Sequence, residues 1–120
     1  MKRVLIVDDN ERVRKVLHQI LRRLPLEIQE ARDGEQGLTL FFQSPFDLII
    51  TDYRMPKMDG LAMLKQCRQR FPELLCIVIS GEHPEGMDQI EKVHFLQKPL
   101  NAGVLVRLVT HLLNMGKTQW

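Results

Sequence analysis

The sequence has no long apolar run, few cysteines and little net charge, and each absence excludes a class of protein. No stretch of about 18 apolar residues is present, and the first residues lead directly into an expected strand, so we expect neither a membrane span nor a signal peptide. Cys67 and Cys76 are not a close-spaced pair, which favours reduced core thiols over a disulfide or zinc site. The net charge of +2 is too small to indicate nucleic-acid binding. We therefore expect a cytoplasmic location and no membrane insertion.

What is present is an ordinary globular composition and a regular alternation of two patterns. The 120 residues suffice for one domain, 1–120, with one hydrophobic core, and 44% of them are apolar. Short apolar runs alternate with segments whose apolar residues recur at helical spacing. This alternation predicts a parallel sheet covered by helices on both faces, and it leaves no room for a second domain.

The expected strands are short and rich in valine and isoleucine, which is typical of strands buried on both faces of a sheet. They cover residues 2–7, 26–31, 46–52, 75–79 and 93–97. The expected helices cover residues 10–24, 37–43, 60–71, 87–92 and 101–114.

Polar side chains stand where four of the apolar runs end. Asp8 and Asp9 follow the first run, Asp52 follows the third, and Ser80 and Lys98 follow the last two. In open α/β sheets, ligands collect at the carboxyl ends of the strands. We therefore expect three acids, a hydroxyl and an amine to meet at one edge of the sheet.

Such a group of residues suits metal binding and phosphoryl transfer. Clustered carboxylates repel one another unless a cation lies among them or one acid is protonated, and oxygen ligands suit Mg²⁺. Lys98 and Ser80 supply charge and donors for phosphoryl oxygens, and a carboxylate can itself be phosphorylated. For Asp8 or Asp9 alone, a helix cap is a plainer interpretation, and Asp59 is expected to cap the helix that follows it.

Four motifs, in this order and at this spacing, resemble those of response-regulator receiver domains. They are Val7-Asp8-Asp9-Asn10, Asp47-Leu-Ile-Ile-Thr-Asp52-Tyr-Arg-Met-Pro-Lys-Met-Asp59-Gly60, Val78-Ile-Ser80-Gly81 and Phe95-Leu-Gln-Lys98-Pro99. The resemblance implies a flavodoxin-like, doubly wound five-stranded parallel sheet of order 2-1-3-4-5. It also implies phosphotransfer, dependent on Mg²⁺ or Mn²⁺, from phosphohistidine on a histidine kinase or histidine phosphotransfer protein.

The resemblance also assigns a role to each residue of the acidic group. Asp52 would be the phosphoacceptor. Asp9 and Asp52 would bind the metal directly, and Asp8 largely through water. The backbone carbonyl of Arg54 would complete the protein ligands.

By the same resemblance, Ser80 and Lys98 would contact the phosphoryl oxygens. In receivers, the hydroxyl residue turns toward the phosphoryl group and an aromatic side chain on the fifth strand swings inward. Phe95 matches that aromatic position, and the alternative is that it is a plain core residue. The switch would change the face formed by the last two strands and the last two helices. Pro99 matches a family proline that follows a cis peptide bond.

Arg54 and Glu82 lie two residues beyond Asp52 and Ser80. One interpretation is that both tune the lifetime of the phosphoryl group by blocking or orienting the attacking water. The other is a solvated surface ion pair.

The stretch between Ser80 and Lys98 departs from the family, being shorter than usual by roughly four residues, about one helical turn. We therefore expect a shortened fourth helix at 87–92, in a locally weak segment with two glycines and a proline. Our hypothesis is that this receiver signals through an unusual surface or dimerises poorly through the usual one. The output domain or partner, and whether the chain is part of a longer regulator or hybrid kinase, are left open.

Two other functions fit parts of the pattern. A Mg²⁺-dependent phosphohydrolase with an aspartate nucleophile commonly has an Asp-x-Asp pattern on its first strand and a cap domain, whereas Asp8 and Asp9 are adjacent and no insertion is large enough for a cap. A degenerate receiver that only binds partners is disfavoured by the intact acids, Ser80 and Lys98. We therefore expect a phosphoacceptor and not an enzyme.

Overall fold

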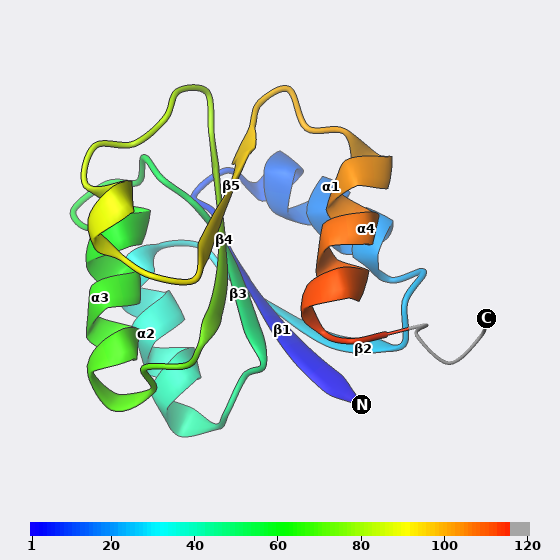
Figure 1. Cartoon of the computed structure of the whole chain (residues 1–120), viewed down its shortest axis with the longest axis horizontal. Helices are drawn as coiled ribbons and strands as arrows, with labels where there is room; N and C mark the ends of the chain where they lie inside the picture. Colours follow the sequence, from blue (N-terminus) through cyan, green and yellow to red (C-terminus); the bar gives the residue numbers. More distant parts are fainter. Residues whose placement is uncertain (116–120) are drawn as a thin grey trace.

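The computed structural model describes residues 1–115 as a central sheet with helices on both faces (Figure 1). Residues 116–120 of the expected domain lie outside the described part. The elements are β1 (Lys2–Val7), α1 (Glu11–Leu21), β2 (Leu26–Ala31), α2 (Gly34–Gln43), β3 (Leu48–Asp52), α3 (Gly60–Arg70), β4 (Leu75–Ser80), the 3₁₀ turn η1 (Met87–Gln89), β5 (Val93–Gln97) and α4 (Ala102–Leu112).

The sheet has five parallel strands in the order β2-β1-β3-β4-β5, which confirms the expected topology. β1 and β3 lie inside it, and their runs from Val4 and Leu48 are fully buried. In Figure 1, α2 and α3 cover one face of the sheet, whereas α1 and α4 cover the other.

Two hydrophobic clusters fill the spaces between these layers. Because successive side chains of a strand point to opposite faces, Leu5 and Val7 pack with the α2–α3 cluster, and Val4 and Ile6 pack with the α1–α4 cluster. The continuous apolar runs of the sequence therefore follow from burial on both faces.

Helix ends differ from the sequence predictions for local reasons. α1 ends at Leu21 and not at Leu24, because Pro25 disfavours a helical backbone at Leu24, the residue before it. The chain continues as a turn in which the N–H of Leu24 donates to the carbonyl of Leu21. α2 begins at Gly34, three residues early, because the Asp33 side chain accepts a hydrogen bond from the N–H of Gln36 and caps the helix.

The expected fourth helix is reduced to the single 3₁₀ turn η1, preceded by Gly86 with a φ of 82°. The Arg68 side chain of α3 lies across this part of the chain. Its Nε donates to the carbonyl of Leu74 at 2.8 Å, and its Nη2 donates to the carbonyl of Lys92 at 3.0 Å. Arg68 thus ties α3 to the residues that lead into β5.

Three smaller predictions can also be compared with the structure. The Lys98–Pro99 peptide bond is cis, as the resemblance implied. Cys67 and Cys76 are free and buried, and burial raises the pKa of their thiols to about 12 and about 11. Within residues 1–115, no helix has the length and apolar character needed to cross a membrane.

Candidate functional site

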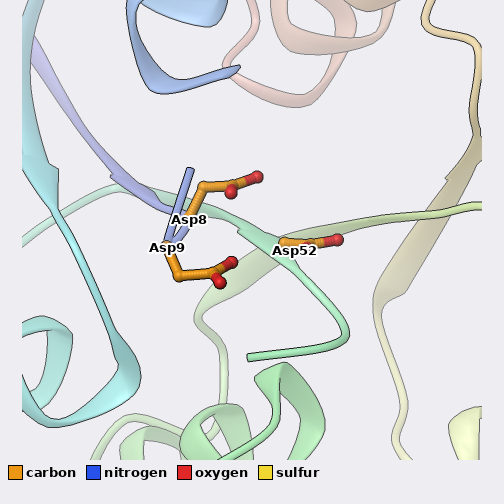
Figure 2. A group of neighbouring side chains, drawn as sticks. All are labelled: Asp8, Asp9 and Asp52. Carbon is orange, nitrogen blue, oxygen red and sulfur yellow. The ribbon is translucent and has the colours of Figure 1, made fainter. Parts of the chain in front are cut away.

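Three carboxylates meet at the carboxyl ends of two neighbouring strands (Figure 2). Asp8 and Asp9 follow β1 directly, and Asp52 is the last residue of β3. One side-chain oxygen from each lies within 4.8 Å of the others. Asp8 and Asp52 are 2% and 9% exposed, whereas Asp9 is exposed. The predicted acidic group is therefore assembled as expected.

Backbone hydrogen bonds hold the first two acids at the start of α1. The Asp8 carboxylate accepts a hydrogen bond from the N–H of Asn10 at 2.8 Å. The Asn10 side chain in turn accepts from the N–H of Val13 at 3.2 Å and caps α1. Asn10 is thus the cap, so the Asp9 side chain is not used to start this helix.

The environment of Asp8 disfavours its ionised form. Burial is the main cause that raises its pKa from 3.8 to about 6, and repulsion from Asp52 and Asp9 acts in the same direction. The hydrogen bond from Asn10 and the charge of Lys98 oppose the rise. Three ionised acids at this edge therefore need further positive charge.

Part of that charge comes from Lys98, which follows β5. Its Nζ donates to Oδ1 of Asp52 at 3.2 Å. The N–H of Tyr53 donates to the same oxygen at 3.0 Å. Both contacts hold the Asp52 carboxylate from one side.

Ser80, the last residue of β4, is buried next to the end of β3. Its hydroxyl oxygen accepts a hydrogen bond from the N–H of Glu82 at 3.3 Å, and its carbonyl accepts from the N–H of Lys98 at 2.8 Å. The N–H of Tyr53 also donates to the carbonyl of Ile79 at 3.2 Å. These bonds join the ends of β3, β4 and β5, where the sequence predicts that Asp52, Ser80 and Lys98 meet.

Phe95 lies in β5, partly buried against the α2–α3 cluster. The ring of His83 stacks on it, with ring centroids 5.0 Å apart and an angle of 25° between the planes. Sequence reasoning did not identify His83, because no local pattern indicates that a residue of the irregular segment reaches β5.

Arg54 and Glu82 form an ion pair between the loops that follow β3 and β4. Both side chains are largely exposed, at 73% and 64%. Glu82 raises the pKa of Arg54 through this contact. The structure brings the pair together, whereas the role of the Arg54 carbonyl as a metal ligand stays a prediction.

Asp59 serves as the cap of α3, as predicted, because its carboxylate accepts a hydrogen bond from the N–H of Ala62 at 2.8 Å. The next residue, Gly60, packs against the backbone of the acceptor strand. A Cβ atom at Gly60 would lie 2.4 Å from the carbonyl oxygen of Asp52. The Asp59-Gly60 pair thus starts the helix and leaves room for the Asp52 peptide.

The donor set fits a hard divalent cation. Asp8, Asp9 and Asp52 offer carboxylate oxygens only, which Mg²⁺ and Mn²⁺ accept, and the exposed Asp9 leaves the site open to water. Burial and repulsion from the neighbouring acids disfavour the ionised form of Asp8, and a divalent cation bound among the three acids would favour it.

Comparison with known proteins agrees with this geometry. The family model for the response regulator receiver domain matches residues 4–110. The chain belongs to this family. The response regulator protein PilR of Pseudomonas aeruginosa is 31% identical over 118 residues, which are 95% of this chain and 26% of that protein. The receiver thus spans about a quarter of the length of PilR.

Solved receiver structures have the same fold. The receiver domain of the hybrid histidine kinase CckA is 34% identical with a TM-score of 0.81, and the match covers 92% of this chain and 98% of that one. The Vibrio cholerae chemotaxis protein CheY4 is 26% identical with a TM-score of 0.85, covering 93% and 98%. This chain is therefore a receiver domain of two-component signalling, with a flavodoxin-like fold.

Proposed function

We propose that this receiver accepts a phosphoryl group on Asp52 from a phosphohistidine, in a reaction that requires Mg²⁺ or Mn²⁺. The donor would be a histidine kinase or a histidine phosphotransfer protein. The main support is the 3.2 Å contact between Lys98 Nζ and Asp52 Oδ1 beside the carboxylates of Asp8 and Asp9. An acceptor carboxylate, an ammonium group and a set of metal ligands are what phosphoryl transfer to an aspartate requires.

The hydrogen bonds suggest which oxygen reacts. Both side-chain contacts of Asp52 fall on Oδ1, so we assign Oδ2 as the nucleophile. A P–O bond forms to Oδ2 while the P–N bond to the donor imidazole breaks. The electron pair of that bond stays on the imidazole nitrogen, and the ring leaves as a neutral histidine after taking up a proton from water.

The residues around Asp52 would then hold the transferred group. The ammonium of Lys98 and the hydroxyl of Ser80 donate hydrogen bonds to the phosphoryl oxygens. Asp8, Asp9 and Asp52, together with the Arg54 carbonyl, would hold the metal ion, whose charge offsets that of the phosphoryl oxygens.

Phosphorylation would change the packing around β4 and β5. Since the Ser80 hydroxyl accepts a hydrogen bond from Glu82, turning it toward the phosphoryl group breaks that contact and loosens the segment that carries His83. Release of His83 from the Phe95 ring lets Phe95 move inward. The signal would thus reach the face of β4, β5, η1 and α4.

We also propose that the Arg54–Glu82 pair tunes the phosphoryl lifetime. Both residues lie just beyond the ends of β3 and β4, where they would block or orient an attacking water. Substitution of either residue should change the rate of phosphoryl loss more than twofold.

We propose a phosphoacceptor and not an enzyme for external phosphomonoesters. The ammonium of Lys98 contacts Asp52 at the end of β3, which supports an acceptor on the third strand and not a nucleophile on the first. The proposal implies a cytoplasmic location, where ATP-dependent kinases work, and no direct contact with nucleic acid.

Mass spectrometry after incubation with acetyl phosphate and Mg²⁺ tests the proposal. We expect one added phosphoryl group on the wild type, removable with hydroxylamine as for an acyl phosphate, and none on Asp52→Asn. Asp88→Asn is a matched control, because Asp88 is an exposed acid in η1. A phosphate that persists in Asp52→Asn, or turnover of a generic phosphomonoester, would contradict the proposal.

A further inference from the structure

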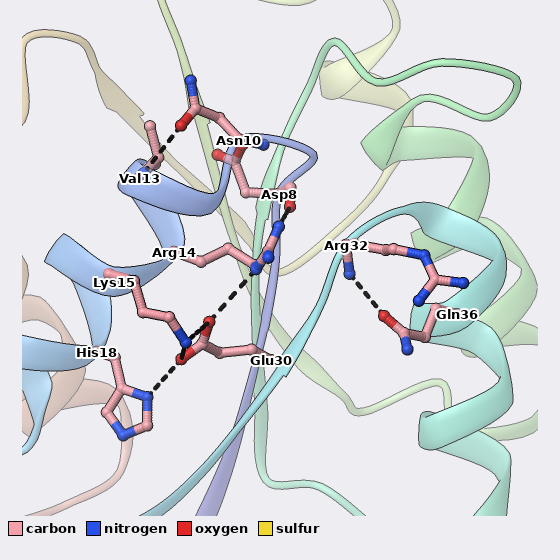
Figure 3. A network of polar contacts seen from close by, with 9 residues as sticks. All are labelled: Asp8, Asn10, Val13, Arg14, Lys15, His18, Glu30, Arg32 and Gln36. Carbon is pink, nitrogen blue, oxygen red and sulfur yellow. Dashed lines mark hydrogen bonds and ion pairs between the residues drawn. The ribbon is translucent and has the colours of Figure 1, made fainter.

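A partly buried acid in β2, Glu30, contacts three basic side chains of α1 (Figure 3). The Glu30 side chain is 15% exposed. Its carboxylate accepts hydrogen bonds from Arg14 Nε at 3.3 Å and from Lys15 Nζ at 3.3 and 3.4 Å, and it contacts His18 Nδ1 at 2.7 Å. Burial alone would raise the pKa of Glu30, but the contacts with His18 and Lys15 outweigh it and lower the pKa. Glu30 is therefore a fixed negative charge between β2 and α1.

Among the three bases, Arg14 makes a second contact that leads to the acidic site. Its Nη1 donates to the backbone carbonyl of Asp8 at 2.8 Å, while its Nε faces Glu30. The Arg14 side chain is only 14% exposed. One guanidinium therefore connects Glu30 to the peptide that joins Asp8 and Asp9, and a guanidinium is the only side-chain group with enough rigid donors for this.

The contact between Arg14 and the Asp8 carbonyl lies just beyond the end of a strand. β1 ends at Val7, so Asp8 and Asp9 lie beyond the strand ladder. The N–H of Asp8 still donates to the carbonyl of Ala31 at 3.1 Å, next to Glu30 in β2. With the Arg14 contact, both backbone polar groups of Asp8 are tied to β2, one directly and one through Arg14 and Glu30.

We propose that Arg14, held by Glu30, is a positioning residue that fixes the Asp8–Asp9 peptide so that both carboxylates converge with Asp52 on a divalent cation. This inference deepens the proposed function and rests on it. Groups that orient metal ligands from outside the ligand set commonly change metal affinity tenfold or more when removed. In this role Arg14 would act through the Asp8 carbonyl and not on the phosphoryl group or the metal.

The charge of Arg14 makes the proposal distinguishable from simple electrostatics. Arg14 is a cation near a cation site, so its charge alone opposes Mg²⁺ binding, and removing it should tighten binding slightly. Loss of positioning has the opposite sign and should weaken binding. The sign of the change in the Mg²⁺ dissociation constant therefore decides between the two effects.

The test compares Arg14→Met with Arg12→Met in the full chain. Met keeps most of the aliphatic stem and removes the donors and the charge. Arg12 is an exposed residue of the same helical turn and serves as the matched control for charge. We expect the Mg²⁺ dissociation constant, measured by NMR titration, to rise about tenfold in Arg14→Met and to stay equal or fall in Arg12→Met.

Two further measurements keep the test decisive. Arg14→Lys keeps the charge, but one ammonium cannot hold both Glu30 and the Asp8 carbonyl, so Mg²⁺ binding should still weaken several-fold. Without metal, the Asn10 amide, which donates to Asp8, should exchange its hydrogen faster in both Arg14 variants and at the wild-type rate in Arg12→Met. Circular dichroism establishes whether each variant is folded. If Arg14→Met is not folded, Mg²⁺ binding by Arg14→Lys decides the test.

The outcomes separate this inference from the proposed function. Wild type that binds Mg²⁺, with Arg14 variants that bind it as tightly as Arg12→Met, overturns the positioning role and leaves the proposed function intact. Wild type that does not bind Mg²⁺ overturns both. Weaker binding in both Arg14 variants, with faster exchange at Asn10, supports the inference.

Discussion

Lys98 reaches the carboxylate of Asp52 from two strands away, and its Nζ lies 3.2 Å from Oδ1. The Asp52 side chain is 10% exposed, so the ammonium is the positive partner of a nearly buried carboxylate. By the proposed function, the same ammonium would contact a phosphoryl group on Asp52. Under the proposed function, Lys98 would hold the Asp52 carboxylate before transfer and the phosphoryl group afterwards, and the two roles can be measured separately.

Lys98→Met should slow phosphorylation of Asp52 while strengthening metal binding. Loss of one preorganised donor and its charge should reduce the phosphorylation rate from acetyl phosphate by about 10²-fold. The Mg²⁺ dissociation constant should fall, because a cation beside the carboxylates has been removed. Lys65→Met, at an exposed site on α3, should leave both quantities unchanged. Weaker Mg²⁺ binding in Lys98→Met would contradict this division of roles.

The pKa of Asp8 predicts how the metal-free domain responds to pH. Its value of about 6 in the folded state lies above the usual 3.8, so folding favours the protonated acid. The free-energy cost of ionising Asp8 in the folded state is absent below about pH 4. This cost grows as the pH rises and reaches its full value above about pH 6. Asp8→Asn mimics the neutral acid, so we expect it to stabilise the metal-free domain at pH 7.5 by on the order of 1 kcal/mol or more.

Urea denaturation in EDTA at pH 7.5 and at pH 4 measures this effect as a difference between wild type and Asp8→Asn. The advantage of Asp8→Asn should vanish at pH 4. With excess Mg²⁺ at pH 7.5, the wild type should gain more stability than the variant, because only its site keeps all three carboxylates. An equal difference between the two proteins at both pH values would mean that the titration of Asp8 is not its cause.

Gly60→Ala should destabilise the domain and distort the acceptor strand. The new Cβ would lie 2.4 Å from the Asp52 carbonyl oxygen, a backbone atom that cannot rotate away. We expect the free energy of unfolding to fall by about 2 kcal/mol or more, together with a lower yield of phosphorylated Asp52. Gly81→Ala is the control, because nothing lies within 4 Å of its Cβ position, and its urea midpoint should match the wild type. Equal midpoints for both variants would refute the close-packing argument.

The sequence predicted the strands and the acidic group because both depend on local patterns. Buried strands appear as continuous apolar runs, and parallel topology brings Asp52, Ser80 and Lys98 together at one edge. The early start of α2 was missed although its signal, Asp33 three residues before Gln36, is also local. The Asp33-Gly34 pair indicates a turn as well as a helix cap. Packing of the following residues decides which of the two forms.

The contacts of Arg14 and Phe95 could not be predicted, because they join residues from separate elements. Glu30 is 16 residues from Arg14 and occupies an alternating position of an edge strand, where an acid ordinarily faces solvent. His83 lies in an irregular segment whose path to Phe95 no periodic pattern describes. Only the register of β2 against β1, and the path from β4 to β5, bring these pairs together.

Arg68 contacts the region where the expected fourth helix is reduced to η1. Its guanidinium donates to the carbonyls of Leu74, Glu91 and Lys92, and Arg68 lines a groove between α3 and the segment before β5. These carbonyls precede β4 and β5, so Arg68 supplies the bonds that order the chain before both strands. We expect Arg68→Ala to lower the free energy of unfolding by about 1.5 kcal/mol, since the part-buried carbonyl of Leu74 and the exposed carbonyls of Glu91 and Lys92 lose a charged donor.

Hydrogen exchange locates the effect of Arg68→Ala. The amides of residues 85–93 should exchange faster than in the wild type, whereas those of β1 and β3 should change only as global stability does. Arg68→Lys should not restore protection, because an ammonium lacks the planar set of donors that reaches three carbonyls. Arg70→Ala, which removes an exposed arginine stacked over Phe42 at the end of the same helix, should cost about 1 kcal/mol or less and leave residues 85–93 unchanged. Wild-type exchange of residues 85–93 in Arg68→Ala would show that another contact orders this segment.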